Sequence, residues 1–259
     1  MSLLEALAIF AAGMAAGTIN TIVGSGTLVT FPTLLFFGYP PVAANMSNSL
    51  GLVAGGITGV HGYRAELRGQ AHVLRRLIPA SLVGSVIGAL LLLVLPASAF
   101  KAIVPVLIGV SVLLVVFGPA LQRRFAKAHE HTEQAVVAQG KSRTAVLLGG
   151  ILFAGAYGGY FGAAQGVLLM GLMSVLMTES LQRLNGYKNV LGTVANAVAA
   201  VVFMIVAWHE IRWEAAGLIA AGALVGGYLG ARIGRRLPPW ALRGVIVVIG
   251  VAAIVNLLR

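Results

Sequence analysis

Long apolar runs, separated by short stretches of glycine, proline and charged residues, are the feature that most constrains this chain. A hydrocarbon core about 30 Å thick is crossed by about 20 residues of α-helix. Residues 73–95 and 240–258 are apolar over that length. With 59% hydrophobic and 10% charged residues, the 259-residue chain has too few polar side chains to cover a water-soluble surface. The sequence therefore predicts an all-α membrane protein with several helical segments.

The apolar runs define ten candidate segments. They lie at residues 3–19, 26–37, 40–62, 73–95, 99–118, 144–160, 165–178, 182–207, 214–235 and 239–258. A polar linker at residues 119–143 divides the chain into an N-terminal transmembrane repeat (1–118) and a C-terminal one (144–259), each of about five segments. The first two segments of each half are short, so we expect them either to cross as two short passes or to form a re-entrant pair.

The basic residues predict how the chain lies in the membrane. The formal net charge is +11, but Lys and Arg stand in short connections between apolar runs, so we expect topology signals and no nucleic-acid partner. Cytoplasmic loops are enriched in Lys and Arg, which favours residues 64–76, the linker and residues 232–243 on the inside. The prediction is a multi-pass protein of the cell inner membrane, with a cytoplasmic linker and both termini outside.

The two halves share a sequence pattern. GTINTIVGSG at residues 17–26 and NMSNSLG at 45–51 correspond, in the same order, to GGYFGAAQG at 158–166 and NGYKNVLG at 185–192. Because each half has an odd number of segments, repeats joined in series have opposite orientations. Many secondary transporters base alternating access on such inverted-topology repeats. Chance similarity between glycine-rich helices is the alternative.

Two glycine-rich breaks at matching places, residues 20–27 and 162–166, predict a substrate site. A broken backbone at membrane depth must face protein or water, because lipid cannot satisfy its N–H and C=O groups. The start of the helix after each break directs free N–H groups and the positive end of the helix dipole at the site, which favours an anion. The side chains there that can donate hydrogen bonds are Asn20, Ser25, Thr27 and Gln165.

A second pair of matched polar stretches adds Asn48 from the third segment and Lys188 and Asn189 from the eighth. Amides can hydrogen-bond an oxyanion, a lysine supplies charge, and ionisable residues within a membrane are functional candidates. Alternatively, Lys188 is close enough to the start of its segment for its stem to reach the interface. The functional interpretation predicts that Asn48, Lys188 and Asn189 converge with the residues of the breaks on a small anion near the bilayer midplane.

The residue types argue against an enzyme. The chain has no Cys and no Asp, and no nucleophile, metal cluster or acid–base pair is predicted at membrane depth. We therefore expect no catalytic residue, no metal site and no cofactor. A passive anion channel lined by the same donors is the closest alternative, followed by an intramembrane enzyme or an assembly protein. The expected partners are a small anion and the lipid bilayer, with a homodimer as an open option.

Four stretches carry a resemblance to a known family, and they read GTINTIVGSGTLVTFPTLLFFG, GAYGGYFGAAQGVLLM, NGYKNVLG and GGYLGARIGRRLP. Together they resemble the sulfite exporter TauE/SafE family, also described as sulfonate uptake permeases, over essentially the whole chain. The resemblance implies a bacterial inner-membrane permease for a small sulfur-containing or organic anion such as sulfite or sulfoacetate, and leaves substrate and direction open. The family often has three glycines where this chain has Gly24, Ser25 and Gly26, so Ser25 is expected to donate a hydrogen bond there.

Overall fold

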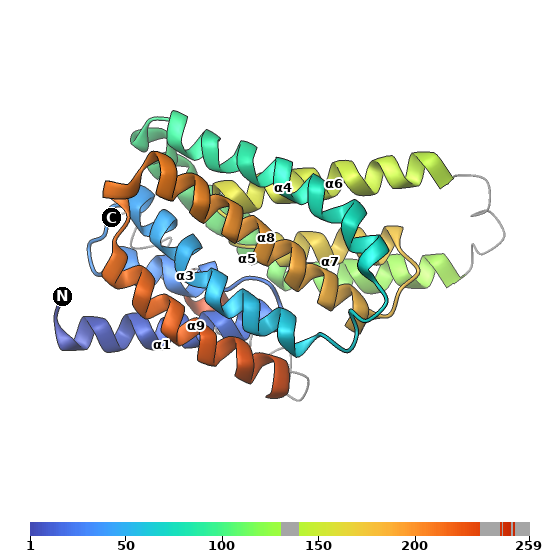
Figure 1. Cartoon of the computed structure of the whole chain (residues 1–259), viewed down its shortest axis with the longest axis horizontal. Helices are drawn as coiled ribbons and strands as arrows, with labels where there is room; N and C mark the ends of the chain where they lie inside the picture. The colour runs from blue at the N-terminus through green and yellow to red at the C-terminus, as the bar shows by residue number, and fades with distance from the viewer. Residues whose placement is uncertain (131–139, 234–243, 245, 250, 252–259) are drawn as a thin grey trace.

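The computed structural model describes residues 1–130, 140–233, 244, 246–249 and 251, and Figure 1 shows a bundle of helices. Within those residues the regular elements are helical, without any β-strand. They are α1 (Leu3–Ile22), α2 (Thr27–Phe36), α3 (Pro41–Gly62), α4 (Ala71–Val94), α5 (Ala97–Glu130), α6 (Gly140–Tyr160), α7 (Gln165–Leu176), α8 (Leu181–Val206), the 3-10 helix η2 (Trp208–Glu210) and α9 (Trp213–Ile233). The predicted all-α fold is confirmed. Most of the predicted tenth segment, 239–258, lies outside the described residues.

Five of the described helical stretches are long and apolar enough to cross a membrane. They are Leu3–Ile22, Ala71–Val94, Ala97–Gly118, Leu181–Val206 and Trp213–Arg232. Large aliphatic side chains face outward from them: on α4, Ile87 is 50% and Val94 80% exposed. Apolar outward faces are suited to contact with lipid. The chain is therefore a multi-pass membrane protein, as the sequence predicts.

Helix lengths differ from the prediction in the opening segment of each half. Both opening segments were expected to be short, but α1 has 20 residues and α6 has 21, so only α2, with 10, and α7, with 12, are short. α6 begins at Gly140, inside the predicted linker, and α5 continues to Glu130. Lys, Arg, Gln and Glu favour a helix as strongly as most apolar residues. An apolar run therefore indicates which residues lie in lipid, but it does not give the first and last residues of the helix.

α1 and α2 form a hairpin whose two ends lie together. Gly24, between the helices, has a φ of 87°, a left-handed conformation that glycine adopts without strain and that lets the chain reverse. The phenol of Tyr39, just after α2, donates a 2.8 Å hydrogen bond to Glu5 Oε1 near the start of α1. Burial and the neighbouring Glu5 carboxylate raise the pKa of Tyr39 to about 12. The phenol therefore keeps its proton, and this hydrogen bond, at neutral pH.

α6 and α7 form a second hairpin of the same kind. Gly162, with a φ of 72°, reverses the chain between them. The guanidinium of Arg143, in the first turn of α6, donates a 3.1 Å hydrogen bond to the carbonyl oxygen of Leu176 at the end of α7. In Figure 1 the N-terminus, where α1 starts, and the start of α6 lie at opposite ends of the long axis. The two hairpins therefore reach into the bundle from opposite ends.

Small residues pack α1, α3 and α9 closely against one another. A Cβ added to Gly17 of α1 would lie 2.4 Å from the carbonyl oxygen of Ala223 in α9. A Cβ added to Gly55 of α3 would lie 2.7 Å from that same oxygen. Small residues at helix interfaces allow backbones to approach in membrane proteins, where dispersion replaces the hydrophobic effect as the source of association. This packing holds the end of α1, and with it the first break, inside the bundle.

Candidate functional site

The two helix breaks meet inside the bundle. The backbone N–H of Gly166 donates a 3.1 Å hydrogen bond to the carbonyl oxygen of Gly24. A Cβ on Gly24 would lie 2.4 Å from the Cα of Gly166, and a Cβ on Gly166 would lie equally close to the Cα of Gly24. Any larger residue at either position would push the two backbone segments apart. Glycine at both positions therefore allows the breaks to form one site.

A small polar cavity lies beside this contact. Its volume is about 20 Å³, which is room for about one water molecule. Its described lining consists of Asn20, Thr21, Gly24, Thr27, Gly56, Gly162, Gln165, Gly166, Lys188, Asn189, Gly192, Thr193 and Asn196. These residues are glycines, amides and hydroxyls, with Lys188 as the ionisable group. The cavity is thus a polar space enclosed by apolar helices.

Most of the residues that the sequence analysis selects lie at this cavity. Those that line it are Asn20, Thr27, Gln165, Lys188 and Asn189. Ser25 and Asn48 do not line it, although both side chains are fully buried. The oxygen of Ser25 has no hydrogen-bond partner among the described residues. The Ser25 side chain is therefore buried outside the cavity lining, and its hydroxyl makes no hydrogen bond within the described structure.

One face of α8 contributes residues that the sequence analysis does not select. Gly192, Thr193 and Asn196 line the cavity together with Asn189. They follow Asn189 at spacings of three, four and seven residues, which is the repeat of one helix face. That spacing is the signal from which they could have been found. On α3, Gly56 leaves space for the Thr193 hydroxyl, which a Cβ would meet at 2.4 Å.

Lys188 is buried in the centre of the site, with 2% of its surface exposed. Its Nζ donates hydrogen bonds to the backbone carbonyl oxygens of Asn20, at 3.1 Å, and Thr21, at 2.9 Å. These carbonyls belong to the last turn of α1, where the helix dipole favours a cation. In the described part of the chain, Lys188 forms no ion pair with a carboxylate. Because Lys188 points at α1, the alternative that its stem reaches the membrane interface is wrong.

Asn48 does not line the cavity itself, but it forms a hydrogen bond with Thr27, which does. Its Nδ2 donates a 3.1 Å hydrogen bond to Thr27 Oγ1, and the hydroxyl of Thr30 donates to Asn48 Oδ1. Because Thr27 Oγ1 accepts the bond from the amide, its own hydrogen remains for another acceptor. Thr27 lines the cavity. The buried Asn48 thus leaves the Thr27 hydroxyl free to donate into the cavity.

Other donors at the cavity have no partner among the described residues. The buried Nε2 of Gln165 makes no hydrogen bond. A Cβ on Gly158 would lie 2.4 Å from that nitrogen, so the glycine leaves the space that the amide occupies. The backbone N–H of Thr27, which lines the cavity at the start of α2, bonds to no backbone carbonyl in the described chain. Free N–H groups at a helix N-terminus bind anions, so this arrangement can hold a small anion.

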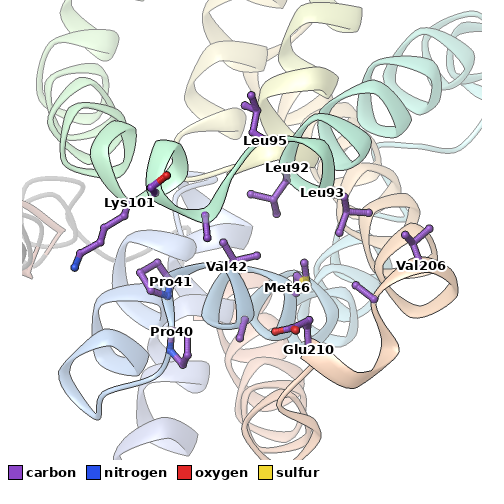
Figure 2. Close-up of a pocket in the computed structure, with 14 residues that line it drawn as sticks. Pro40, Pro41, Val42, Met46, Leu92, Leu93, Leu95, Lys101, Val206 and Glu210 are labelled. Atoms are coloured by element: carbon purple, nitrogen blue, oxygen red, sulfur yellow. The ribbon is translucent and has the colours of Figure 1, made fainter.

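A larger cavity, drawn in Figure 2, is one that the sequence analysis does not predict. Pro40 in its lining follows Tyr39, whose phenol bonds Glu5 near the start of α1. The volume of this cavity is about 610 Å³. Apolar residues from the starts of α3 and α5 and the ends of α4 and α8 form most of its wall, and Lys101 and Glu210 are the ionisable residues of the described lining. Apolar walls of this kind carry the same sequence pattern as a helix core. Only the spacing between the helices reveals the cavity.

Four buried aromatic rings pack against one another, and we refer to Phe31, Phe100, Tyr160 and Phe161 as the aromatic cluster. The ring centroids of Phe31 and Phe161 are 5.1 Å apart, and those of Phe100 and Tyr160 are 5.6 Å apart, in edge-to-face geometry. Phe100 precedes Lys101 of the large cavity, and Phe161 precedes Gly162 of the small one. All four rings are buried, and the cluster includes the chain neighbours of residues that line both cavities.

Helical spans around a buried polar site with paired helix breaks are typical of multi-pass membrane transporters. The chain belongs to the Sulfite exporter TauE/SafE family, whose model matches residues 9–257. The resemblance found in the sequence motifs is thereby confirmed. The family is one of probable membrane transporters, which agrees with the prediction that the chain is not an enzyme.

Curated relatives cover most of the chain. A probable membrane transporter protein of Haemophilus influenzae is 28% identical over 87% of this chain and 83% of the relative. One of Sinorhizobium sp is 26% identical over 96% of this chain and 91% of the relative. The probable membrane transporter protein YfcA of Escherichia coli K12 is 28% identical over 88% of this chain and 79% of the relative. No solved structure matches the chain.

Proposed function

We propose that this protein is a secondary transporter that moves a small anion across the inner membrane by alternating access. The anion is a sulfur oxyanion or an organosulfonate such as sulfite or sulfoacetate. The contact between Gly24 and Gly166 carries this proposal, since two broken helix pairs meet there beside a buried polar cavity. Transporters with discontinuous helices bind their substrates at such breaks, near the bilayer midplane.

The groups around the cavity favour an anion over a cation. Lys188 brings positive charge, the Gln165 amide nitrogen has no partner among the described residues, and the backbone N–H of Thr27 bonds to no backbone carbonyl there. Among the described lining residues there is no carboxylate. Hydrogen bonds to an ionised acceptor are about twice as strong as those between neutral groups. An oxyanion therefore gains more from these donors than a neutral solute does.

Two inverted-topology repeats, residues 1–118 and 144–259, are part of the proposal, with the linker at residues 119–143 in the cytoplasm. The α1–α2 and α6–α7 hairpins support this symmetry because they start from opposite ends of the bundle and meet at equivalent breaks. The Lys and Arg enrichment of cytoplasmic loops places the basic loop at residues 64–76 in the cytoplasm, on the side proposed for the linker. Both termini then lie outside.

Alternating access requires the small cavity to open toward one side at a time. Its volume of about 20 Å³ holds about one water molecule, whereas sulfite has four heavy atoms, so a substrate enters only after movement. We infer that the aromatic cluster, which includes the chain neighbours of residues lining both cavities, closes the path between them. The large cavity then acts as a vestibule on the side where α1 starts. A closed path of this kind favours a carrier over a passive channel. Rocking of one half against the other would exchange the open side.

Anion uptake into proteoliposomes that hold the purified protein tests the proposal. Sulfite, sulfate, thiosulfate and sulfoacetate are compared, and counterflow of labelled anion against unlabelled anion separates a carrier from a channel. We expect saturable flux and counterflow of at least one sulfur anion. Lys188→Met should abolish the flux, whereas Arg68→Met, which removes an exposed basic residue from the connection between α3 and α4, should retain it. Absence of flux for all four anions, or full flux in Lys188→Met, would contradict the proposal.

A further inference from the structure

We infer that Lys188 is a built-in coupling cation. Its ammonium group occupies, at the end of α1, the kind of position that a free sodium ion occupies in other transporters with broken helices. The inference rests on the proposed transport function and adds to it how the charge of the anion is balanced. Its consequence is that the protein needs no sodium ion, because a covalently attached cation already fills the site.

The ligands of the ammonium group are those of a cation site. Nζ contacts two consecutive backbone carbonyl oxygens, those of Asn20 at 3.1 Å and Thr21 at 2.9 Å. Both belong to the last turn of a helix that ends inside the bundle. Carbonyls at the C-terminal ends of broken helices coordinate the coupling ion in transporters of this architecture, and the dipole of such an end attracts positive charge.

The site leaves no space for a second cation beside Lys188. Asn189 Nδ2 donates a 3.2 Å hydrogen bond to the carbonyl oxygen of Thr21, which Lys188 also contacts. A Cβ on Gly59 would lie 2.9 Å from Thr21 Oγ1 and 3.6 Å from Asn189 Oδ1, so this wall is closely packed. The adjoining cavity holds about 20 Å³. A free ion and the lysine therefore exclude each other.

The buried charge of Lys188 has no anionic partner within the described protein. The residue is 2% exposed, and the ion pair present among the described residues joins Arg183 to Glu179 instead. An unpaired charge in a low-dielectric interior is unfavourable. Two of the three ammonium hydrogens point at α1, which leaves one for the cavity that Lys188 lines. An anion in that cavity supplies the missing countercharge, so the two sites are coupled.

Two substitutions separate the charge of Lys188 from its volume. Lys188→Ala removes both, leaving the carbonyls of Asn20 and Thr21 facing a void that a sodium or methylammonium ion can enter. Lys188→Met fills nearly the same volume with an uncharged side chain and leaves no such space. Only the alanine variant should therefore respond to added cations, and the methionine variant is its matched control.

The test measures the melting temperature of the purified protein in sodium chloride, methylammonium chloride and choline chloride at equal concentration. We expect the wild type to melt at one temperature in all three salts. Lys188→Ala should melt lower in choline and recover in sodium or methylammonium, and Lys188→Met should stay low in every salt. Stabilisation of the wild type by sodium, or an equal response of the two variants, overturns the inference. Where Lys188→Ala gives no folded protein, the sodium response of the wild type decides.

Sulfite flux into wild-type proteoliposomes, with sodium or choline outside, separates this inference from the proposed function. Equal flux in both salts supports the inference, and a requirement for sodium overturns it while anion transport stands. If no anion moves but the melting temperatures follow the expected pattern, the transport proposal fails and the cation role of Lys188 remains.

Discussion

The carbonyl oxygen of Gly24 accepts a 3.1 Å hydrogen bond from the N–H of Gly166, and this backbone contact joins the α1–α2 hairpin to the α6–α7 hairpin. The two hairpins come from different halves of the chain and from opposite ends of the bundle. The geometry of the cavity beside the contact therefore depends on how closely two glycines approach. Each of the variants below changes one group around that contact.

Gly166→Ala should destabilise the protein and stop transport. The added Cβ would lie 2.4 Å from the Cα of Gly24, and overpacking of this kind costs about 1–3 kcal/mol. Gly171→Ala on the same helix is the control, since a Cβ there meets nothing within 4 Å, and replacing a glycine in a helix stabilises it by about 0.5–1 kcal/mol. Melting temperature and anion flux measure both effects. Equal behaviour of the two variants would show that the hairpins need not touch.

Gln165→Leu should weaken anion binding because it deletes the unpaired amide donor at the cavity. A hydrogen bond to a charged group contributes about 1.5–3 kcal/mol, so we expect the Kd for the transported anion to rise about tenfold or more. Gly158→Ala should produce the same loss, since its Cβ would meet the amide nitrogen at 2.4 Å. Calorimetric titration gives both values.

Gly149→Ala is the matched control for Gly158→Ala, because both glycines belong to α6 and a Cβ at Gly149 meets nothing within 4 Å. The control should bind the anion as the wild type does. If Gly158→Ala and Gly149→Ala have the same Kd, the amide of Gln165 has no part in binding.

Asn48→Ala and Thr27→Val should weaken anion binding through a shared interaction. The Asn48 amide donates to Thr27 Oγ1 and so leaves the threonine hydrogen free for the anion. Once Thr27 has lost its hydroxyl, removal of Asn48 should add little, giving a coupling free energy of about 0.5–3 kcal/mol in a double-mutant cycle on Kd. Additive losses would mean that Asn48 contacts the anion directly or acts only on stability.

The aromatic cluster should control access from the large cavity to the small one. The chain has no native Cys, so single cysteines report accessibility without background. Ser98→Cys, in the large cavity, should react with a membrane-impermeant thiol reagent, and Asn196→Cys, in the small cavity, should not. Adding Phe100→Ala to Asn196→Cys should raise its labelling rate by removing a buried ring of the barrier.

Phe117→Ala controls for the loss of a ring from α5, since Phe117 is 61% exposed on the outer face of the helix. Combined with Asn196→Cys, it should leave labelling slow. Fast labelling of Asn196→Cys without a second substitution would mean that the cluster does not close this path.

The sequence by itself determined the membrane class, the family and the positions of both helix breaks. Each of these depends on local properties: an apolar run sets residence in lipid, and a glycine-rich interruption ends a helix wherever it stands. Asn20, Thr27, Gln165, Lys188 and Asn189 could be selected because polar groups in such segments are costly without a purpose. The lengths of α1 and α6 could not be predicted from the sequence, since both helices extend past their apolar residues.

Only the tertiary structure decided which groups face each other. Nothing local in the chain indicates that Gly24 meets Gly166, or that Lys188 turns toward the carbonyls of α1 rather than toward the interface. Asn48 and Ser25 have the same polar character as the lining residues, yet packing buries both behind the cavity wall. The physical reason is that these contacts join segments far apart in the chain, and the contact between the two breaks forms only because Gly24 and Gly166 carry no side chain.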